Sequence, residues 1–293
     1  MRRTPTTTNR ATLISNCDAL ITAAARMSGS LSEPGEYVTR VSRSAVWNLV
    51  RGADTIASAH AMCRPDGRWF VSIDAWDDAA WAPLAAVMIK DLDCDLHTVV
   101  DESDGATLAS WRRFGFQTAR REIDYVIPVD PGVSGLVDSR LPDGMVMLAA
   151  DAVDETELRL LDDTLRADGP GSDGWLNDPQ EFRERSFDER YFDPATYLVA
   201  LDDAGPAFAG LVRIAVLPRR PRLGLIGVSS GYRRRGLARA LLAAAFAALH
   251  DRGFTQVSAE VDATNTASVR LLEQIGAERV GASVVLVRQR ESR

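Results

Sequence analysis

The chain has 293 residues, of which 46% are hydrophobic and 26% are charged, proportions typical of a folded globular protein with room for two domains. Its formal net charge of -7 argues against general binding to nucleic acid or anionic membranes, because both need a positive protein face. The sequence indicates neither a signal-peptide core nor a run of about 18 apolar residues, so we expect a cytoplasmic protein.

Cysteine and lysine are both scarce. The three cysteines, Cys17, Cys63 and Cys94, lie far apart without a C-x-x-C pair, which predicts neither a disulfide framework nor a zinc site. We therefore expect a reducing compartment and no bound metal. Lys90 is the only lysine among the 34 basic residues, a usage that suggests a high-GC bacterial genome.

The first half of the chain predicts three strands and then a helix. The strands are expected at residues 44–52, 55–63 and 68–76, joined by short turns, and the helix at 79–91. The segment 126–144 follows, with three prolines and three glycines. We place a domain boundary there, which gives predicted domains at 1–130 and 145–293.

The second half repeats this order. Strands are predicted at 195–203, 207–217 and 222–230, and an alanine-rich helix at 236–250 that ends near Gly253. The fold class is thus α/β (α+β), with a mixed, mostly antiparallel sheet flanked by helices in each half.

Two segments, which start at Val99 and Glu260, resemble each other in one register. Asp104 aligns with Asn265 and Gly115 with Gly276, in both cases 161 positions apart. Each segment indicates a strand, a helix that begins at an acidic or amide residue, and a glycine after the helix. Finding the unit twice suggests tandem duplicated domains.

Three arginines, Arg233 to Arg235, stand immediately before Gly236 at the start of the alanine-rich helix. The first N–H groups of a helix lack internal acceptors, and the helix dipole makes this end positive, so the site suits a phosphate. Gly236 lets a large anion approach the main chain. No Asp or Glu lies between residues 204 and 250, so a role as a salt-bridged surface is the weaker interpretation. A pyrophosphate therefore fits this position.

The spacing Arg233-x-x-Gly236-x-Ala238 after a strand resembles the acyl-coenzyme A signature of the GNAT superfamily of N-acetyltransferases, and Asn265, Ala267, Leu271 and Gly276 stand where that family carries an Asn and a glycine ending. The likeness spans about 145–288. It implies tandem GNAT-like domains, acetyl-CoA as co-substrate, and these residues around it: Ile226, Gly227, Val228, Arg233, Arg234, Arg235, Gly236, Leu237, Ala238, Arg239, Asn265 and Ser268.

Two positions depart from that family. Leu272 stands where many members have a Tyr that donates a proton to the leaving thiolate, and Ala277 replaces a Phe. The sulfur would then be protonated by water or another side chain. In the first half, the turn after the third strand contains Asp77 and Asp78 and no glycine, which predicts a degenerate copy without a cofactor site.

Acetyl transfer to an amine needs a group that accepts the ammonium proton. A further strand is expected at 257–265. Glu260 and Asp262 lie two residues apart on it and hence on one face, and Glu260 is the preferred base, directly or through a water. The alternative is that one or both are exposed strand residues or helix-cap partners. Tyr232 and His250 are lesser candidates.

The acceptor is expected to bind near residues 162–194, because 151–203 contains 16 acidic residues against five arginines. This composition favours a small cationic amine, with Trp175 lining the site, although solvated helices are an alternative. Other functions left open are acetylation of a protein amino terminus or lysine, and a non-catalytic acyl-CoA-binding protein. No nucleic-acid or membrane partner is expected, and the chain is expected to be a monomer or homodimer.

Overall fold

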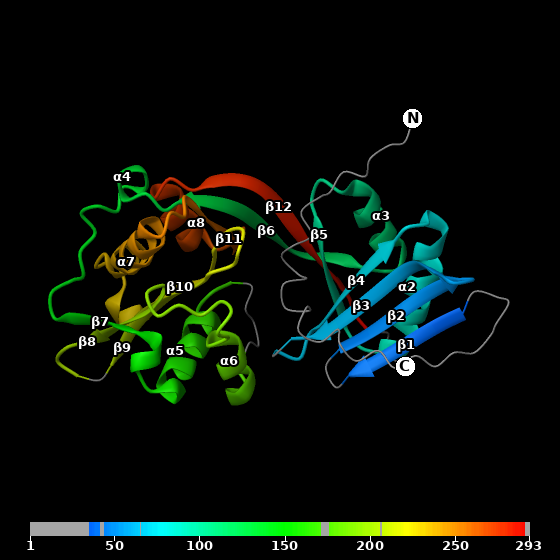
Figure 1. Cartoon of the computed structure of the whole chain (residues 1–293), viewed down its shortest axis with the longest axis horizontal. Helices are drawn as coiled ribbons and strands as arrows, with labels where there is room; N and C mark the ends of the chain where they lie inside the picture. The colour runs from blue at the N-terminus through cyan, green and yellow to red at the C-terminus, as the bar shows by residue number, and fades with distance from the viewer. Residues whose placement is uncertain (1–34, 42–43, 65, 171–175, 206, 291–293) are drawn as a thin grey trace.

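The computed structural model describes residues 35–41, 44–64, 66–170, 176–205 and 207–290, so Cys17 and Trp175 lie outside the described residues. Within these ranges all strands belong to one sheet of 12 in the order β1-β2-β3-β4-β5-β12-β6-β11-β10-β9-β8-β7 (Figure 1). The first-half elements are β1 (Gly35–Val41), β2 (Ser44–Arg51), β3 (Asp54–Cys63), β4 (Trp69–Ala75), α2 (Asp78–Leu92), β5 (Leu96–Asp101), α3 (Gly105–Arg113) and β6 (Gln117–Pro128).

The short helix α4 (Pro131–Ser134) leads into the second half. The second-half elements are β7 (Met145–Ala149), η1 (Ala150–Ala152), α5 (Glu155–Ala167), α6 (Pro179–Ser186), β8 (Tyr197–Asp202), β9 (Phe208–Ala215), β10 (Arg222–Val228), η2 (Ser230–Tyr232), α7 (Leu237–Asp251), β11 (Gln256–Asp262), α8 (Thr266–Gln274) and β12 (Glu278–Arg288).

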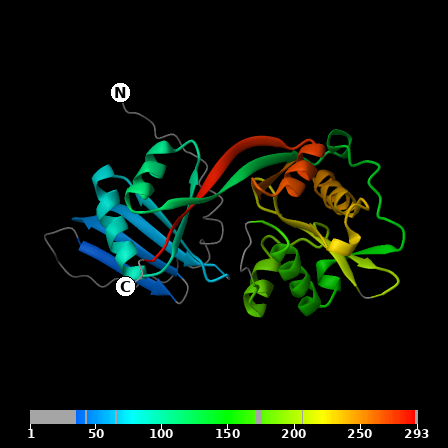
Figure 2. The same ribbon diagram turned by 180° about the vertical axis from the view of Figure 1, so that it is seen from behind.

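The last strand of each half crosses to the other half. β6 pairs with β11 of the second half from Gln256↔Pro128 to Asp262↔Glu122, and β12 pairs with β5 of the first half. The two crossing strands also pair with each other, and they run side by side between the two lobes in Figures 1 and 2. Each half therefore completes its sheet with a strand from the other, and the division into domains 1–130 and 145–293 stays a prediction.

The helices define two faces of this sheet. Ile123, Tyr125 and Ile127 of β6 pack in one core with residues of α7 and α8, and Val284 and Leu286 of β12 pack in another with α2 and α3. Helices α5 and α6 cover the opposite face of the second half, where Leu158, Leu165 and Phe182 form a third core. We call this opposite side of the sheet the α5 face; side chains there lie on the even-numbered positions of β6 and β11.

The duplicated segments have matching local structure. Asp104 caps α3 by accepting a hydrogen bond from the amide of Thr107, and Asn265 caps α8 in the same way through Ser268. Gly115 (φ +83°) and Gly276 (φ +76°) both end their helices in the left-handed conformation. The predicted helix starts and stops are confirmed.

The predicted strands and long helices correspond to β2, β3, β4, α2, β8, β9, β10 and α7, with ends within a few residues. Sequence reasoning missed β1 and β7, which lie at the two edges of the sheet. In β7 half-buried residues alternate with exposed ones, so the short run MVMLA lacks the fully buried pattern of an interior strand. No helix in the described part of the chain is long and apolar enough to cross a membrane.

Candidate functional site

Strands β10 and β11 are parallel but separate soon after they meet. They pair only at Arg222↔Ser258 and Leu223↔Ala259, whereas β10 continues to Val228 and β11 to Asp262. The predicted segment Ile226–Val228 lies on the separated part of β10 and is half-buried. Its backbone groups on the β11 side have no strand partner there, so an extended ligand with amide groups can pair with them.

A helix start without a side-chain cap lies just beyond β10. The chain passes through η2 to Gly236, whose φ of +85° favours glycine, and the first helical bond runs from the amide of Ala240 to the carbonyl of Gly236. The amides of Leu237, Ala238 and Arg239 therefore precede the helical ladder. A Cβ built on Gly236 meets no atom within 4 Å, so the approach to these amides is open. These features fit a pyrophosphate.

The arginines of the motif have different contacts. Arg233 donates through Nε to the carbonyl of Val228 (2.9 Å) and pairs with Asp168 at the end of α5 (2.8 Å). The expectation that the cluster lacks acidic partners is therefore wrong for Arg233, because the fold supplies Asp168 from outside the 204–250 window. Arg239 donates to the carbonyl of Gly135 (2.5 Å). These two side chains hold the loop and the helix in place.

Arg234 and Arg235 are exposed. Arg234 adopts φ +65°, which is uncommon for a residue with a Cβ, and the guanidinium of Arg235 lies 5.6 Å from the ring centre of Tyr232. Tyr232 in turn donates to Asp202. Arg233 is exposed as well but is ion-paired with Asp168, whereas among the described residues neither Arg234 nor Arg235 forms an ion pair.

Helix α5 lies directly over the separated end of β10. A Cβ on Gly227 would come within about 3.0 Å of the Leu165 side chain, and a Cβ on Gly210 of β9 would meet the carbonyl of Gly227 at 2.6 Å. Small residues at both positions let α5 and the neighbouring strands approach closely.

Asn265 and Ser268 contact each other rather than standing free. The Asn265 side-chain oxygen accepts from the amide of Ser268 (3.1 Å), which forms the N-cap of α8. Asp262 shapes the same turn by accepting from the amide (2.8 Å) and hydroxyl (2.5 Å) of Thr264. The first half contains the same turn, in which Asp101 accepts from the amide and hydroxyl of Ser103.

This repetition indicates that the contacts of Asp262 maintain the strand-to-helix turn, since the first half keeps them without the arginine–glycine loop. A catalytic role for Asp262 stays a prediction.

Glu260 is the first residue of β11 beyond its pairing with β10, and it lies on the α5 face. Its carboxylate accepts a hydrogen bond from the guanidinium of Arg222 on β10. Directly across the sheet, β6 places Asp124 opposite Glu260. Sequence reasoning missed Asp124, because only the crossing of β6 into the second half brings it here.

The position expected for a tyrosine is buried. Leu272 is 1% exposed within the core formed by α7 and α8, and its first-half equivalent Trp111 is 2% exposed in the other core. Both residues pack the helix onto the sheet. Leu272 has no hydroxyl, so this position of α8 cannot donate a proton to a departing sulfur.

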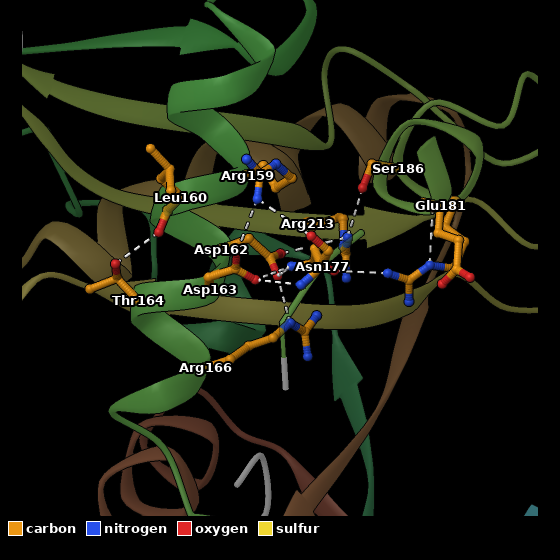
Figure 3. A network of polar contacts seen from close by, with 11 residues as sticks. Arg159, Leu160, Asp162, Asp163, Thr164, Arg166, Asn177, Glu181, Ser186 and Arg213 are labelled. Carbon is orange, nitrogen blue, oxygen red and sulfur yellow. Dashed lines mark hydrogen bonds and ion pairs between the residues drawn. The ribbon is translucent and has the colours of Figure 1, made fainter. Parts of the chain in front are cut away.

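A buried polar network joins α5 to α6 and β9 (Figure 3). Asp162 is 0% exposed and accepts from Arg166 (2.6 Å) and from the side chain of Asn177 (2.9 Å), with Arg213 3.7 Å away. Burial alone would raise the pKa of Asp162, but the charges of Arg213 and Arg166, together with the hydrogen bonds from Arg166 and Asn177, leave that pKa below its ordinary value. Asp163 accepts from the Asn177 amide (2.9 Å), so the chain leading into α6 is fixed to α5.

The acidic segment is largely occupied by such contacts. Asp154 and Asp178 cap α5 and α6, and further carboxylates form ion pairs: Glu155 with Arg183, Asp188 with Arg190, Asp193 with Arg252 and Asp168 with Arg233. Such caps and ion pairs are what the alternative interpretation of the acidic residues in 151–203, as part of ordinary solvated helices, leads one to expect. They account for many of the carboxylates expected to attract a cationic acceptor.

The corresponding place in the first half looks different. β4 and β5 also pair only at Trp69↔Leu96 and Phe70↔His97, so the separated strands are retained. However, Asp77 caps α2 by accepting from the amide of Ala79 (3.0 Å), and it pairs with Arg51 (2.9 Å). A carboxylate thus occupies the helix start that is left open in the second half.

A separate hollow of about 370 Å³ lies where β5 ends beside β12, lined by residues 101–103 and 280–282 and by Arg121. None of the predicted cofactor residues lines it. Across the described ranges, no group of three His, Cys, Asp or Glu side chains is arranged to hold a metal ion.

The separated strands and the uncapped helix start together fit the shape of a pyrophosphate-bearing carrier with an extended amide arm. Residues 160–277 match the model of the acetyltransferase (GNAT) family.

Similar proteins extend the comparison. The chain is 34% identical over 172 residues to a mycothiol acetyltransferase of Salinispora arenicola, covering 56% of this chain and 52% of that protein. It is 25% identical over 210 residues to one of Saccharopolyspora erythraea, covering 67% of each. The chain thus spans about half the length of the Salinispora relative.

Solved structures show the same fold. A GCN5-related N-acetyltransferase from Sphaerobacter thermophilus has a TM-score of 0.64 at 17% identity, covering 84% of this chain and 81% of that one. A tandem GNAT protein from the clavulanic acid biosynthesis pathway has a TM-score of 0.62 at 17% identity, covering 85% and 84%. The predicted fold class is confirmed.

Proposed function

We propose that this protein is an acetyl-CoA-dependent N-acetyltransferase that acetylates a primary amine of a small molecule. The observation that carries the proposal is the separation of β10 from β11 beside the uncapped start of α7, with Arg234 and Arg235 exposed there. The names of the relatives, mycothiol acetyltransferases, support the reaction type. We also propose a cytoplasmic location and a monomer or homodimer.

Each part of the site has a proposed task. The amides of Leu237 to Arg239, with Arg234 and Arg235, would hold the pyrophosphate. The unpaired backbone of Ile226 to Val228 would pair with the amide arm and polarise the thioester carbonyl. When bound, acetyl-CoA supplies an activated acetyl thioester. Arg233 would act by holding the loop, through the contacts to Val228 and Asp168.

Asn265 and Ser268 would contribute by fixing the start of α8 near the arm. Glu260 is proposed to take part in removing the ammonium proton, directly or through a water, because it lies where β11 leaves β10. A protein amine as acceptor would use the same residues.

One observation favours a second candidate, a non-catalytic acyl-CoA-binding protein. The buried Leu272 offers no proton for the leaving sulfur. If water supplies this proton, the acetyltransferase needs no further group, because the thiolate of coenzyme A is only a moderate base and can leave before it is protonated.

Two measurements on the full chain test the proposal. Titration calorimetry with acetyl-CoA should show one site per chain. Mass spectrometry after incubation with acetyl-CoA and a panel of spermidine, glucosamine, kanamycin and a peptide library should detect an acetyl group on a small amine. Binding without any acetylated product would favour the non-catalytic candidate, acetylated peptides alone would favour a protein acceptor, and no binding would contradict all three.

A further inference from the structure

A pair of carboxylates lies where the two halves meet. Asp124 of β6 and Glu260 of β11 are directly opposite in the antiparallel register, so their side chains lie on the same face with Cβ atoms about 4.5–5.5 Å apart. This is the α5 face, because the alternate residues Ile123 and Tyr125 pack with α7 and α8. The pair stands at the point where β11 leaves β10.

The duplication provides an internal comparison for this pair. In the 161-residue register of the two halves, Glu260 corresponds to Val99 and Asp124 corresponds to Val285. Val99 and Val285 are also directly opposite each other, on β5 and β12. The same place in the scaffold therefore holds two valines in the half with the capped helix start. Like charges directly opposite on a sheet are unfavourable, so the acidic pair costs stability that the valine pair does not.

The two carboxylates differ in their partners. Glu260 is ion-paired with Arg222. Within the described residues, the hydrogen bond to the Asp124 carboxylate is a long one from the hydroxyl of Ser283 (3.5 Å). Gly281 leaves room for it, because a Cβ there would lie 3.2 Å from Asp124 Oδ2. In the described part of the chain Asp124 forms no ion pair, although Arg121, which is hydrogen-bonded to Glu102, lies near enough for its charge to interact with Asp124.

The surroundings of Asp124 are mostly acidic. Burial raises the pKa of Asp124 to about 6, helped by the charges of Glu260, Glu122 and Asp101, while Ser283 lowers it slightly. The basic groups on this face belong to other carboxylates: Arg222 contacts Glu260, and Arg120 contacts Glu122. Arg64, which follows β3, lies close enough for electrostatic interaction with the charges of Glu122, Arg120 and Arg222.

We propose that Asp124, a residue of the first half, binds the acceptor's ammonium group and is the direct acceptor of its proton. The part proposed for Glu260 is thereby narrowed to the effect of its charge, which Arg222 holds beside Asp124. This inference rests on the proposed acetyltransferase function. It gives the first half a direct part in the reaction, because the crossing strand β6 carries Asp124 to the second half's site.

The step balances in protons and bonds. The ammonium gives one proton to the Asp124 carboxylate and becomes a neutral amine, whose nitrogen then forms a bond to the acetyl carbon. The carbon–sulfur bond breaks and releases the coenzyme A thiolate. The nitrogen loses its second proton to solvent, and the thiolate takes up one proton from solvent, so these two transfers cancel. Asp124 returns its proton to solvent, so the net products are the amide, the thiol and one proton.

The test compares the full-length wild type with Asp124→Asn, using spermidine or glucosamine, whichever the wild type acetylates faster. Since the base must be ionised, kcat/KM of the wild type should fall below about pH 6. Asp124→Asn should lower kcat/KM by about 10²–10⁴-fold and remove this limb, while calorimetric binding of acetyl-CoA stays unchanged. Asp124→Glu should recover part of the activity and keep an acidic limb.

Glu122→Gln is the matched control. It neutralises an acid on the same face and strand, two residues away, and leaves Asp124 in place. Its kcat should stay within about threefold of the wild type, and its acidic limb should move to lower pH, because one of the charges that raise the Asp124 pKa is gone.

Thermal stability gives a readout that needs no amine. A carboxyl whose pKa is raised on folding contributes stability that is present below the unfolded value near 3.8 and is lost as pH rises through about 6. Asp124→Asn should therefore raise Tm at pH 7.5, and the gain should shrink toward pH 5.

The outcomes separate the two proposals. A wild type that acetylates no amine contradicts the proposed function, whatever the Tm shows. If the wild type acetylates an amine and Asp124→Asn keeps a normal kcat/KM with an unchanged acidic limb, the role of Asp124 is contradicted. Loss of activity with a Tm lowered at every pH also contradicts it, because a merely structural side chain would behave that way.

Discussion

The two halves of this protein share one scaffold but differ at the helix that follows the separated strands. Both halves part their parallel strands after two paired residues, at Leu223↔Ala259 in one and Phe70↔His97 in the other. At the next helix, Gly236 leaves the amides uncapped in the second half, whereas the Asp77 carboxylate caps α2 in the first. The two copies thus share a backbone arrangement, and the side chains at the helix start differ between them.

A second difference lies where the crossing strands β6 and β12 pair with the other half. The pair Asp124 and Glu260 stands on the side of the open helix start, and the equivalent pair is Val99 and Val285. Two apolar side chains can pack at this position, whereas the acidic pair sets like charges opposite each other, and within the described residues only Glu260 forms an ion pair. If the proposed function holds, the first copy contributes a strand and a carboxylate to the site of the second copy rather than a second cofactor site.

The largest expected effect comes from making the second helix start resemble the first. Gly236→Glu should weaken acetyl-CoA binding by more than about 100-fold, because it places a negative charge beside the pyrophosphate position and strains a φ of +85°. Titration calorimetry measures it. Gly236→Asn, which tolerates this conformation without a charge, should lose far less, and Gly231→Ala, in open space, should bind normally. Equal losses in all three variants would contradict the electrostatic account.

The buried network tests what holds α5 over the separated strands of the second half. Asp162→Ala leaves Arg166 and Arg213 without their buried partner and should cost about 3–5 kcal/mol of unfolding free energy. Denaturant unfolding gives the value. Glu184→Ala, on the exposed side of α6, should leave the midpoint unchanged. A similar midpoint for both variants would mean that the network does not stabilise this half.

The exposed arginines should account for a smaller share of affinity. Arg234→Ala and Arg235→Ala should each weaken acetyl-CoA binding about 10- to 100-fold, and the loss should shrink as salt is added, since charge-assisted contacts at the surface are screened. Calorimetry at two ionic strengths measures both effects. Losses that do not depend on salt would indicate that these side chains act through loop conformation instead.

The smallest effect is expected from opening the first helix start. Asp77→Gly removes the cap of α2 and its pairing with Arg51, so Tm should fall slightly. The stoichiometry of acetyl-CoA should remain one per chain, because this turn has neither the arginines nor the glycine of the second half. A second bound acetyl-CoA would show that Asp77 alone closes the first copy.

Local features of both fold and site were predictable from the sequence. The caps at Asp104 and Asn265, the glycines that end their helices and the turn at Gly236 depend on neighbouring residues, so spacing sufficed to locate them. Edge strands such as β7 were missed, because a partly exposed strand lacks a continuous apolar run.

Long-range pairing accounts for what the sequence could not reveal. Asp168 reaches Arg233 across 65 positions, and Asp124 meets Glu260 only because β6 and β12 cross between the halves. The composition of 151–203 suggested an acidic surface, but caps and ion pairs occupy many of those carboxylates. Charge counted along a chain does not reveal which partner each group finds in the fold.

A crystal structure of the full chain grown with acetyl-CoA tests the central claim most directly. The account predicts one acetyl-CoA per chain, with its pyrophosphate on the amides of Leu237 to Arg239 and its amide arm along Ile226 to Val228. Acetyl-CoA bound instead between β4 and β5 of the first half, or at the hollow beside Gly281, would contradict it.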